Sequence, residues 1–346
     1  MDGPIIAIHG AGSIGCWIGG CWAAAGLRVR FVGRPGVRDA IAESGMTLTD
    51  SAGWRTRLAP EQVEFSTQPK ALAKADIIAL CVKTTATAEA AKEIAKHGRK
   101  GALVLSFQNG VSNGELLRGM LGNSFEVVEG MVPFNVAYLG HGRWHKGTAG
   151  DLVAGDAPRT HDLAEQIGDG PGRLRIDADM ASVAWGKLLI NLNNAVNALS
   201  GRTLLEELKA RDYRKVLAAS IVEALELLKL AKIRPAKIGP VPPNLLPHVI
   251  AAPDFVFGQF LKIQKIDAKA RSSMFDDLRA GRRTEIDFLN GEVVKLATRL
   301  RRRAPVNEAI VALIKQAEAG VEHLWSPEDL RRHVMEAHKG TPLFGY

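Results

Sequence analysis

The sequence of 346 residues has little of what secreted and membrane proteins need. It contains only three cysteines, Cys16, Cys21 and Cys81, and no CxxC pair, which excludes a disulfide framework and favours a reducing cytosol. No run reaches about 18 apolar residues, so we expect no membrane-spanning helix. The N-terminus lacks a basic stretch with a small-residue cleavage site, so we expect no signal peptide. Together these absences predict a cytoplasmic protein without a membrane partner.

Charge of one sign is not in large excess either, since 45 basic and 37 acidic residues give a net +8. A net positive charge of this size can favour binding to nucleic acid, to a membrane surface or to a small anionic ligand. The densest basic run, Arg299 with residues 301–303, ends a predicted helix, where cations complement the dipole, and it lacks aromatics that could stack on bases. We therefore expect no nucleic-acid partner and favour a small anionic substrate and cofactor. The nine histidines are scattered, and no metal site is predicted.

The first 176 residues alternate between short apolar runs and helical patterns. Apolar runs this continuous are typical of parallel strands covered on both faces, and their alternation with helices indicates a doubly wound α/β sheet. Residues 127–153 instead alternate around glycine turns, which predicts antiparallel strands that extend or cap the sheet. The predicted strands are residues 4–9, 28–33, 76–82 and 102–106, and the predicted helices are residues 13–25, 87–97 and 110–121.

From residue 177 onward, apolar residues recur at spacings of three and four, which is typical of helices. Residues 237–253 hold five prolines and are predicted to form a loop. The predicted helices are residues 181–199, 213–233, 272–300 and 307–319, with a short amphipathic helix at 327–339. These patterns predict three parts, which are an α/β domain over residues 1–176, an all-helical domain over 177–322 and a C-terminal extension over 323–346.

A GxGxxG sequence follows the first predicted strand and precedes a helix. Gly10 permits the tight turn, Gly12 lets a pyrophosphate approach the backbone, and Gly15 lets the helix pack closely on the strand. The helix N-terminus adds free N–H groups and a partial positive charge. The alternative is a glycine-rich turn that binds nothing. The predicted cofactor-binding stretch is Gly10, Ala11, Gly12, Ser13, Ile14 and Gly15.

The end of the second predicted strand indicates which dinucleotide binds. Folds that bind NAD usually place Asp or Glu about 20 residues past the glycine motif, on the ribose 2′-hydroxyl. This chain has Gly33 and Arg34 there, and a guanidinium pairs with a 2′-phosphate that a carboxylate would repel. We therefore predict NADP(H), with Arg34 as a contact. The alternative is that Arg34 is a solvated loop residue.

Besides the glycine motif, the chain contains CVKT at residues 81–84, QNG at 108–110, WGKLLIN at 185–191, SSM at 272–274, RTEIDFLNG at 283–291 and APVN at 304–307. Taken together, these motifs resemble the ketopantoate reductase (2-dehydropantoate 2-reductase) family. The resemblance implies a Rossmann-type NADP-binding domain and a helical domain like the C-terminal part of 6-phosphogluconate dehydrogenase. It implies that NADPH reduces the C2 ketone of ketopantoate to D-pantoate in pantothenate biosynthesis.

The resemblance also implies roles for single residues. Lys187 would be the general acid, and Glu285 would act with it as a catalytic residue while holding the substrate together with Ser273. Asn109 would lie near the nicotinamide and the reacting carbonyl, and Lys83 would help to bind the cofactor. On these grounds Glu285 and Asn109 are also expected to contact the cofactor.

The residues around Lys187 support part of this reading on their own. Reduction of a ketone needs a proton donor beside the carbonyl, and a cation there stabilises the charge that develops on oxygen. Lys187 stands in an otherwise apolar helical stretch, and Asn191, one turn later, shares its face. Asn194 extends that face, so both asparagines are predicted substrate contacts. Glu285 would raise the pKa of the lysine, although it could instead pair with a neighbouring arginine, Arg282 or Arg283.

Two positions depart from the family pattern. Ala195 and Ala270 stand where the family often has asparagine, and Lys269 and Arg271 flank the second of them. The substrate could therefore be another small 2-keto acid or ketone, whose carboxylate Lys269 or Arg271 could hold. A non-catalytic regulator that binds NADP(H) is a further alternative. Helical second domains in this superfamily often dimerise, so we expect a homodimer.

Overall fold

A computed structural model describes residues 3–264, 267, 269–321 and 323–339. These residues separate into two compact units that divide after Met180. No helix within the described ranges is long and apolar enough to cross a membrane.

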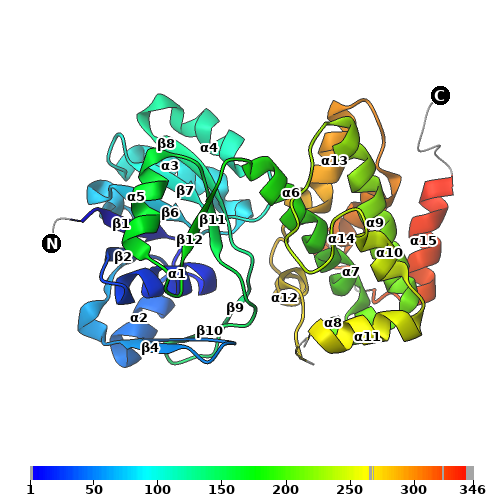
Figure 1. Cartoon of the computed structure of the whole chain (residues 1–346), viewed down its shortest axis with the longest axis horizontal. Coiled ribbons are helices and arrows are strands. Elements are labelled where there is room, and N and C mark those ends of the chain that lie inside the picture. Colours follow the sequence, from blue (N-terminus) through cyan, green and yellow to red (C-terminus); the bar gives the residue numbers. More distant parts are fainter. Residues whose placement is uncertain (1–2, 265–266, 268, 322, 340–346) are drawn as a thin grey trace. The chain divides into compact units, whose positions relative to one another are not determined.

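The first unit is built on an eight-stranded sheet (Figure 1), with strand order β12-β11-β8-β7-β6-β1-β2-β5. Neighbouring strands are parallel except β8 and β11. The strands are β1 (Ile5–His9), β2 (Arg28–Val32), β5 (Glu64–Ser66), β6 (Ile77–Leu80), β7 (Leu103–Ser106), β8 (Glu126–Met131), β11 (Leu152–Gly155) and β12 (Leu174–Asp177). The helices are α1 (Ser13–Ala24), α2 (Pro35–Ser44), α3 (Thr87–His97), α4 (Asn113–Leu121) and α5 (Pro158–Ile167). The predicted doubly wound sheet is confirmed.

Alternate residues of the central strands enter two separate cores, one on each face of the sheet. Ile6 and Ile8 of β1 belong to the core that includes α1, whereas Ala7 belongs to the core that includes α3 and α4. Strands β6 and β7 alternate in the same way. Because both faces are covered, these strands carry continuous apolar runs, as parallel strands in such sheets do.

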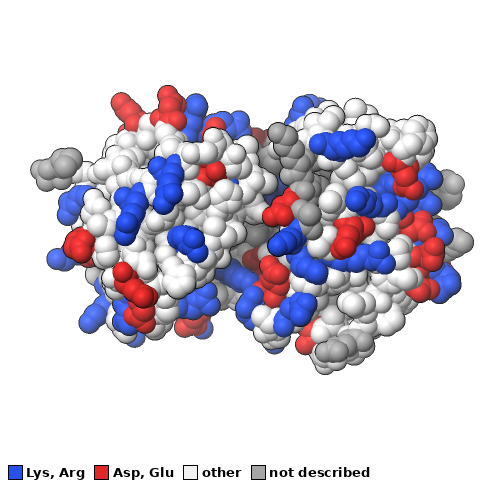
Figure 2. Space-filling model, turned by 90° about the horizontal axis from the view of Figure 1, so that it is seen from below, with Lys and Arg blue, Asp and Glu red and all other residues white. Residues whose placement is uncertain are grey.

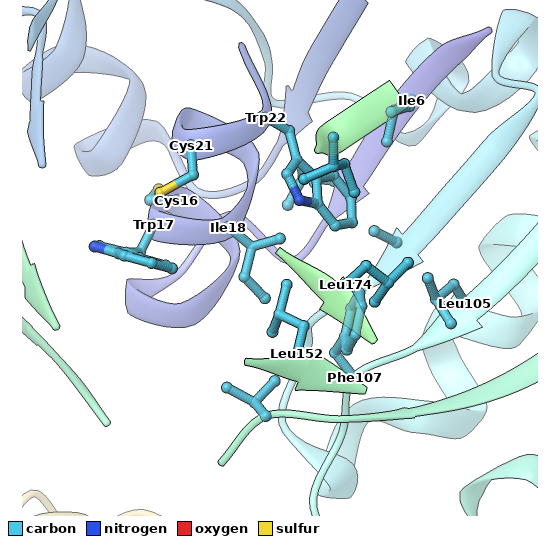
Figure 3. Packing of buried hydrophobic residues seen from close by; sticks show 14 of the residues in the cluster. Ile6, Cys16, Trp17, Ile18, Cys21, Trp22, Leu105, Phe107, Leu152 and Leu174 are labelled. Atoms are coloured by element: carbon cyan, nitrogen blue, oxygen red, sulfur yellow. The ribbon is translucent and has the colours of Figure 1, made fainter. Parts of the chain in front are cut away.

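A second sheet of four strands, in the order β4-β3-β10-β9, packs against α1. The strands are β3 (Met46–Asp50), β4 (Arg55–Leu58), β9 (Val136–Tyr138) and β10 (Arg143–Lys146). Helix α1 has apolar residues on all sides because it lies between the two sheets. A Cβ atom added at Gly19 would come within 2.6 Å of Ile8 of the large sheet, and one at Gly20 within 2.6 Å of Leu48 of the small sheet. Figure 3 shows the apolar cluster around this helix, including Trp22.

The prediction for residues 127–153 is therefore partly confirmed. Strand β11 pairs antiparallel with β8 and extends the large sheet. Strands β9 and β10 instead join β3 and β4 in the second sheet, which the sequence did not predict. Strand β8 itself is parallel to β7.

The second unit consists of helices. They are α6 (Met180–Asn191), α7 (Asn193–Ser200), α8 (Leu204–Lys209), α9 (Arg211–Leu230), α10 (Leu246–Ala251), α11 (Asp254–Gln264), α12 (Ser273–Arg279), α13 (Asn290–Arg299), α14 (Pro305–Glu318) and α15 (Pro327–Lys339). The longest of them, α9, contacts α7, α8, α10, α13, α14 and α15. Helix α15 packs on α9 and α14 through the buried side chains of Leu330 and Val334.

Three predictions for this unit were wrong in detail. The helix predicted over residues 181–199 is interrupted at Leu192, because apolar spacing alone continues through the break. The predicted loop over 237–253 contains α10, whose Pro247 lies in the first turn, where a missing N–H is tolerated. The helix predicted over 272–300 is two helices, α12 and α13, separated by a turn in which Gly281 has a φ of 62°.

Candidate functional site

The glycine loop follows β1 and is tied to the end of β2. The backbone N–H groups of Gly10 and Ala11 both donate to the carbonyl of Val32 at 3.0 Å. Gly10 has a φ of 99°, and a Cβ atom there would lie 2.5 Å from the backbone nitrogen of Val82. Only glycine satisfies both conditions, so the tight turn has the reason that the sequence predicted.

The other two glycines of the motif differ in their surroundings. A Cβ at Gly15 would lie 2.4 Å from the carbonyl oxygen of Gly10, so the helix packs directly on the loop. A Cβ at Gly12 would meet no protein atom within 4 Å. Gly12 also begins α1 without a side-chain cap, and the first turn holds no acidic residue. The backbone N–H groups in the first turn of α1, which Ser13 and Ile14 begin, therefore suit the pyrophosphate of a dinucleotide.

Arg34 lies where β2 ends and α2 begins. It is exposed, it precedes the first turn of α2, and within the described part of the chain it forms no ion pair. Arg38, four residues later, is already paired with Asp39 at 2.7 Å. Arg34 is therefore the cation in this loop that is available to a phosphate.

The CVKT and QNG segments follow neighbouring strands, β6 and β7, and are joined by hydrogen bonds. The side-chain amide of Gln108 donates to the carbonyl of Val82 at 3.2 Å, and the hydroxyl of Thr84 donates to the carbonyl of Asn109 at 2.8 Å. Parallel strands end at the same edge of a sheet, so Lys83 and Asn109 lie at the edge that carries the glycine loop.

Sequence reasoning did not assign Gln108, Thr84 or Thr87, although all three are buried polar residues. Gln108 also donates to the hydroxyl of Thr87 at 2.7 Å, and Thr87 donates to the side chain of Asn113 at 2.9 Å. This network fixes the loop that carries Asn109. The available signal was the occurrence of these polar residues directly after apolar strands.

In the second unit, Lys187 lies on α6 and is partly buried. Burial lowers the pKa of its ammonium group to about 8, and the nearby Glu285 carboxylate acts in the opposite direction. The site therefore contains a cation whose pKa is close to neutrality and an anion beside it. In such a pair the lysine can donate a proton, while the carboxylate keeps the lysine oriented.

Glu285 stands at the start of a short 3₁₀ turn (Ile286–Phe288), and only 8% of it is exposed. The preceding residue, Thr284, donates to Glu318 through both its backbone N–H and its hydroxyl, each at 2.7 Å, which fixes this turn. Of the two arginines that could pair with Glu285, Arg282 binds Asp277 at 2.9 Å. Asp277 itself is only 2% exposed.

The expected substrate contacts lie around the interruption of the helix. Asn191 is the last residue of α6 and Asn194 is in the first turn of α7, and both are partly buried. Ser273 begins α12 and is exposed, and its neighbour Ser272 donates to the carbonyl of Asn194 at 3.0 Å. This bond joins the first turn of α7 to the start of α12. Ala195, the first departure from the family pattern, is fully buried, so Asn194 takes the accessible position.

The second departure, Ala270, is followed by Arg271, whose side chain is bound by two other residues of this unit. Arg271 donates to the carbonyl of Gly201 at 2.8 Å, and its guanidinium lies 4.2 Å from the centre of the Phe275 ring. This double contact orients Arg271 on the same segment as Ser273.

Gly186, directly before Lys187, was not assigned a role. A Cβ atom at Gly186 would lie 2.2 Å from the carbonyl oxygen of Ala236. The segment around Ala236 is bound to α6, because its N–H donates to the carbonyl of Ser182 at 2.8 Å. Glycine at this position therefore lets the chain after α9 cover one side of the helix that carries Lys187.

A Rossmann-type sheet with a glycine loop at its edge, followed by a helical unit with a lysine near a carboxylate, is typical of a nicotinamide-dependent oxidoreductase. Family models named "Ketopantoate reductase PanE/ApbA" and "Ketopantoate reductase PanE/ApbA C terminal" match residues 6–159 and 179–318. The chain belongs to the ketopantoate reductase family.

Individual relatives agree with this assignment. The 2-dehydropantoate 2-reductase of Pyrococcus abyssi is 28% identical over 327 residues, which cover 91% of this chain and 98% of the relative. A ketopantoate reductase structure from Ralstonia eutropha JMP134 is also 28% identical, with a TM-score of 0.76 over 91% of this chain and 99% of that one. A dimeric ketopantoate reductase from Staphylococcus aureus shares the fold at 15% identity, with a TM-score of 0.69 and coverage of 91% and 99%.

Proposed function

We propose that the protein reduces 2-dehydropantoate to D-pantoate with NADPH. The observation that carries the proposal is Lys187, partly buried on α6, with a pKa near 8 and the Glu285 carboxylate beside it. Bound NADPH supplies the hydride for the ketone carbon, C2. Lys187 supplies the proton for the ketone oxygen, so that one ketone, one NADPH and one proton give one alcohol and one NADP⁺.

The other side chains bind and orient. Asn109, Asn191, Asn194 and Ser273 are proposed to hold the substrate, and Glu285 to hold both the substrate and the lysine. The glycine loop, Lys83 and Arg34 are proposed to hold the cofactor, with Glu285 and Asn109 as further contacts. Each of these groups is a hydrogen-bond donor, a hydrogen-bond acceptor or a charge suited to a hydroxy or keto acid or to a phosphate.

The test is NADPH oxidation with ketopantoate and a panel of other small 2-keto acids. Ketopantoate is expected to give a kcat/KM at least about tenfold above the other acids, a discrimination of about 1.4 kcal/mol. A higher kcat/KM for another 2-keto acid would make that acid the proposed substrate. Such an acid is the second candidate because Ala270 stands where the family often has asparagine. No oxidation with any acid would favour a regulator that binds NADP(H).

We further propose a homodimer in the cytosol. The dimeric relative from Staphylococcus aureus supports a dimer, and the three free cysteines support a reducing compartment. Helix α11 exposes Phe255 at 78% and Ile263 at 74%, so its apolar side is available for a contact. The mass of the native protein in solution tests the dimer, and a monomer at micromolar concentration would oppose it.

The proposal includes no nucleic-acid partner. Figure 2 shows basic and acidic side chains intermixed over the visible face of each unit. In the basic run that ends α13, Arg303 is already paired with Glu308 at 2.6 Å. A shift in electrophoretic mobility of a duplex at physiological salt would contradict this part of the proposal.

A further inference from the structure

Helix α8 carries a carboxyl group that none of the roles above uses. Glu207 is fully buried, and burial raises the pKa of its carboxyl to about 8. Its Oε2 accepts hydrogen bonds from the side-chain amides of Asn193 at 3.1 Å and Asn197 at 3.3 Å. These two donors lie one turn apart at the start of α7. One carboxyl group thus fixes the turn that follows the interruption of the helix.

The same turn is fixed to α12. The side-chain oxygen of Asn197 accepts from the backbone N–H of Ser272 at 2.9 Å, and the hydroxyl of Ser272 donates to the carbonyl of Asn194 at 3.0 Å. The hydroxyl of Ser272 also caps α12. A chain of hydrogen bonds therefore runs from Glu207 through α7 to the N-terminus of α12, where Ser273 follows Ser272.

We propose that Glu207 is a positioning residue, which sets the placement of Asn194 and Ser273 through Asn197 and Ser272. The inference rests on the proposed function, since these two residues are the proposed substrate contacts. Without the carboxyl, the amide of Asn193 would lose this buried acceptor, and the amide of Asn197 would keep only its hydrogen bond to the carbonyl of Arg202 at 3.1 Å. The turn would then be less firmly held relative to α12. Displaced substrate contacts bind the substrate more weakly, which raises KM.

Steady-state kinetics with ketopantoate and NADPH test the proposal. Glu207→Ala is expected to raise the KM for ketopantoate by about tenfold or more, while NADPH binding, followed by fluorescence, stays close to wild type. Glu207→Gln keeps an acceptor oxygen and is expected to restore the KM. The matched control is Glu206→Gln on the same helix, because Glu206 is exposed and caps α8 with Thr203, which glutamine also does.

Hydrogen–deuterium exchange makes the test independent of the substrate. Glu207→Ala is expected to speed exchange in residues 193–200 and in α12, which Glu207 does not touch directly, whereas Glu206→Gln leaves both unchanged. If Glu207→Ala does not fold, Asn193→Ala, which removes one of the two contacts, takes its place with smaller effects in the same directions. Should the wild-type protein not reduce ketopantoate, the proposed function fails, and exchange in α12 alone decides the role of Glu207. A folded Glu207→Ala variant with wild-type exchange in α12, or with a wild-type KM in an active enzyme, would overturn the proposal.

Discussion

The glycine loop of the first unit and the lysine site of the second are fixed by different parts of the chain. The loop is made of backbone, in which Gly10, Gly12 and Gly15 leave N–H groups accessible and allow close contacts that a side chain would prevent. The proposed lysine site draws on side chains from α6, α7, α12 and the turn before α13, and polar residues such as Asn197 and Thr284 bind α7, α12 and this turn to the rest of the unit. A local motif can specify the first kind of site, whereas the second depends on tertiary contacts.

The most severe test of this difference is Lys187→Ala. Loss of the proton donor is expected to reduce kcat by on the order of 100-fold or more, while the dissociation constant for NADPH stays close to wild type, because the glycine loop is unchanged. Steady-state and binding measurements on the same preparation give both values. Lys229→Ala, at the exposed end of α9, is the control. Near-normal turnover of Lys187→Ala would remove Lys187 from the mechanism.

Arg34→Asp changes a side chain at the backbone site. Arg34 is proposed to bind the 2′-phosphate of NADPH, and an aspartate would repel this phosphate. The ratio of kcat/KM for NADPH to kcat/KM for NADH is therefore expected to fall ten- to a hundredfold, which corresponds to about 1.4–3 kcal/mol. Arg38→Asp carries the same charge change four residues away, where the guanidinium is already paired with Asp39, and is expected to leave the ratio nearly unchanged. Equal effects of the two substitutions would indicate a general charge effect instead of a specific contact.

Two glycines of the loop separate binding from stability. Gly12→Ala adds a Cβ that meets no protein atom, so the protein should keep its stability but bind NADPH about tenfold more weakly, a loss of about 1.4 kcal/mol. Gly15→Ala places a Cβ 2.4 Å from a carbonyl oxygen and is expected to lower the free energy of unfolding by about 1–3 kcal/mol. Denaturant titration and NADPH binding distinguish the two. The reverse pattern would mean that Gly12 is a packing residue.

The same distinction explains how far the sequence predicts the structure. The strands β1, β2, β6 and β7 and the glycine loop were predictable, because continuous apolar runs and glycine spacing are local signals. The four-stranded sheet was not, since β3 pairs with β10 about a hundred residues later along the chain. Its indirect signal was α1, whose glycines and tryptophans leave it without a polar face.

Within the candidate site, sequence motifs suggest the candidate residues but not the residues that hold them in place. Lys187 and Glu285 were found through motifs, and the electrostatic effect of Glu285 on Lys187 agrees with the pairing expected from the motifs. The break at Leu192 was missed because apolar spacing continues on both sides of it. Glu207 was missed because a glutamate in the sequence LLEELK resembles a surface residue, and only its burial distinguishes it from Glu206.

The smallest expected effect is a displacement on the pH axis, and it tests whether Lys187 and Glu285 act as a pair. The pKa of Lys187 is lowered to about 8, and the proton donor must be protonated. The kcat/KM is therefore expected to be constant below about pH 8 and to fall above it, and the midpoint of this fall gives the pKa of the proton donor in the free enzyme.

Glu285 raises this pKa, so Glu285→Gln should move the fall in kcat/KM to lower pH, whatever it does to the maximum rate. Asp287→Asn makes the same charge change two residues away, where Asp287 is paired with Lys315, and should leave the fall in place. A fall in kcat/KM that stays at its wild-type pH in Glu285→Gln, or moves upward, would show that the two side chains are not coupled, and the lysine site would then lose the tertiary dependence that sets it apart from the glycine loop.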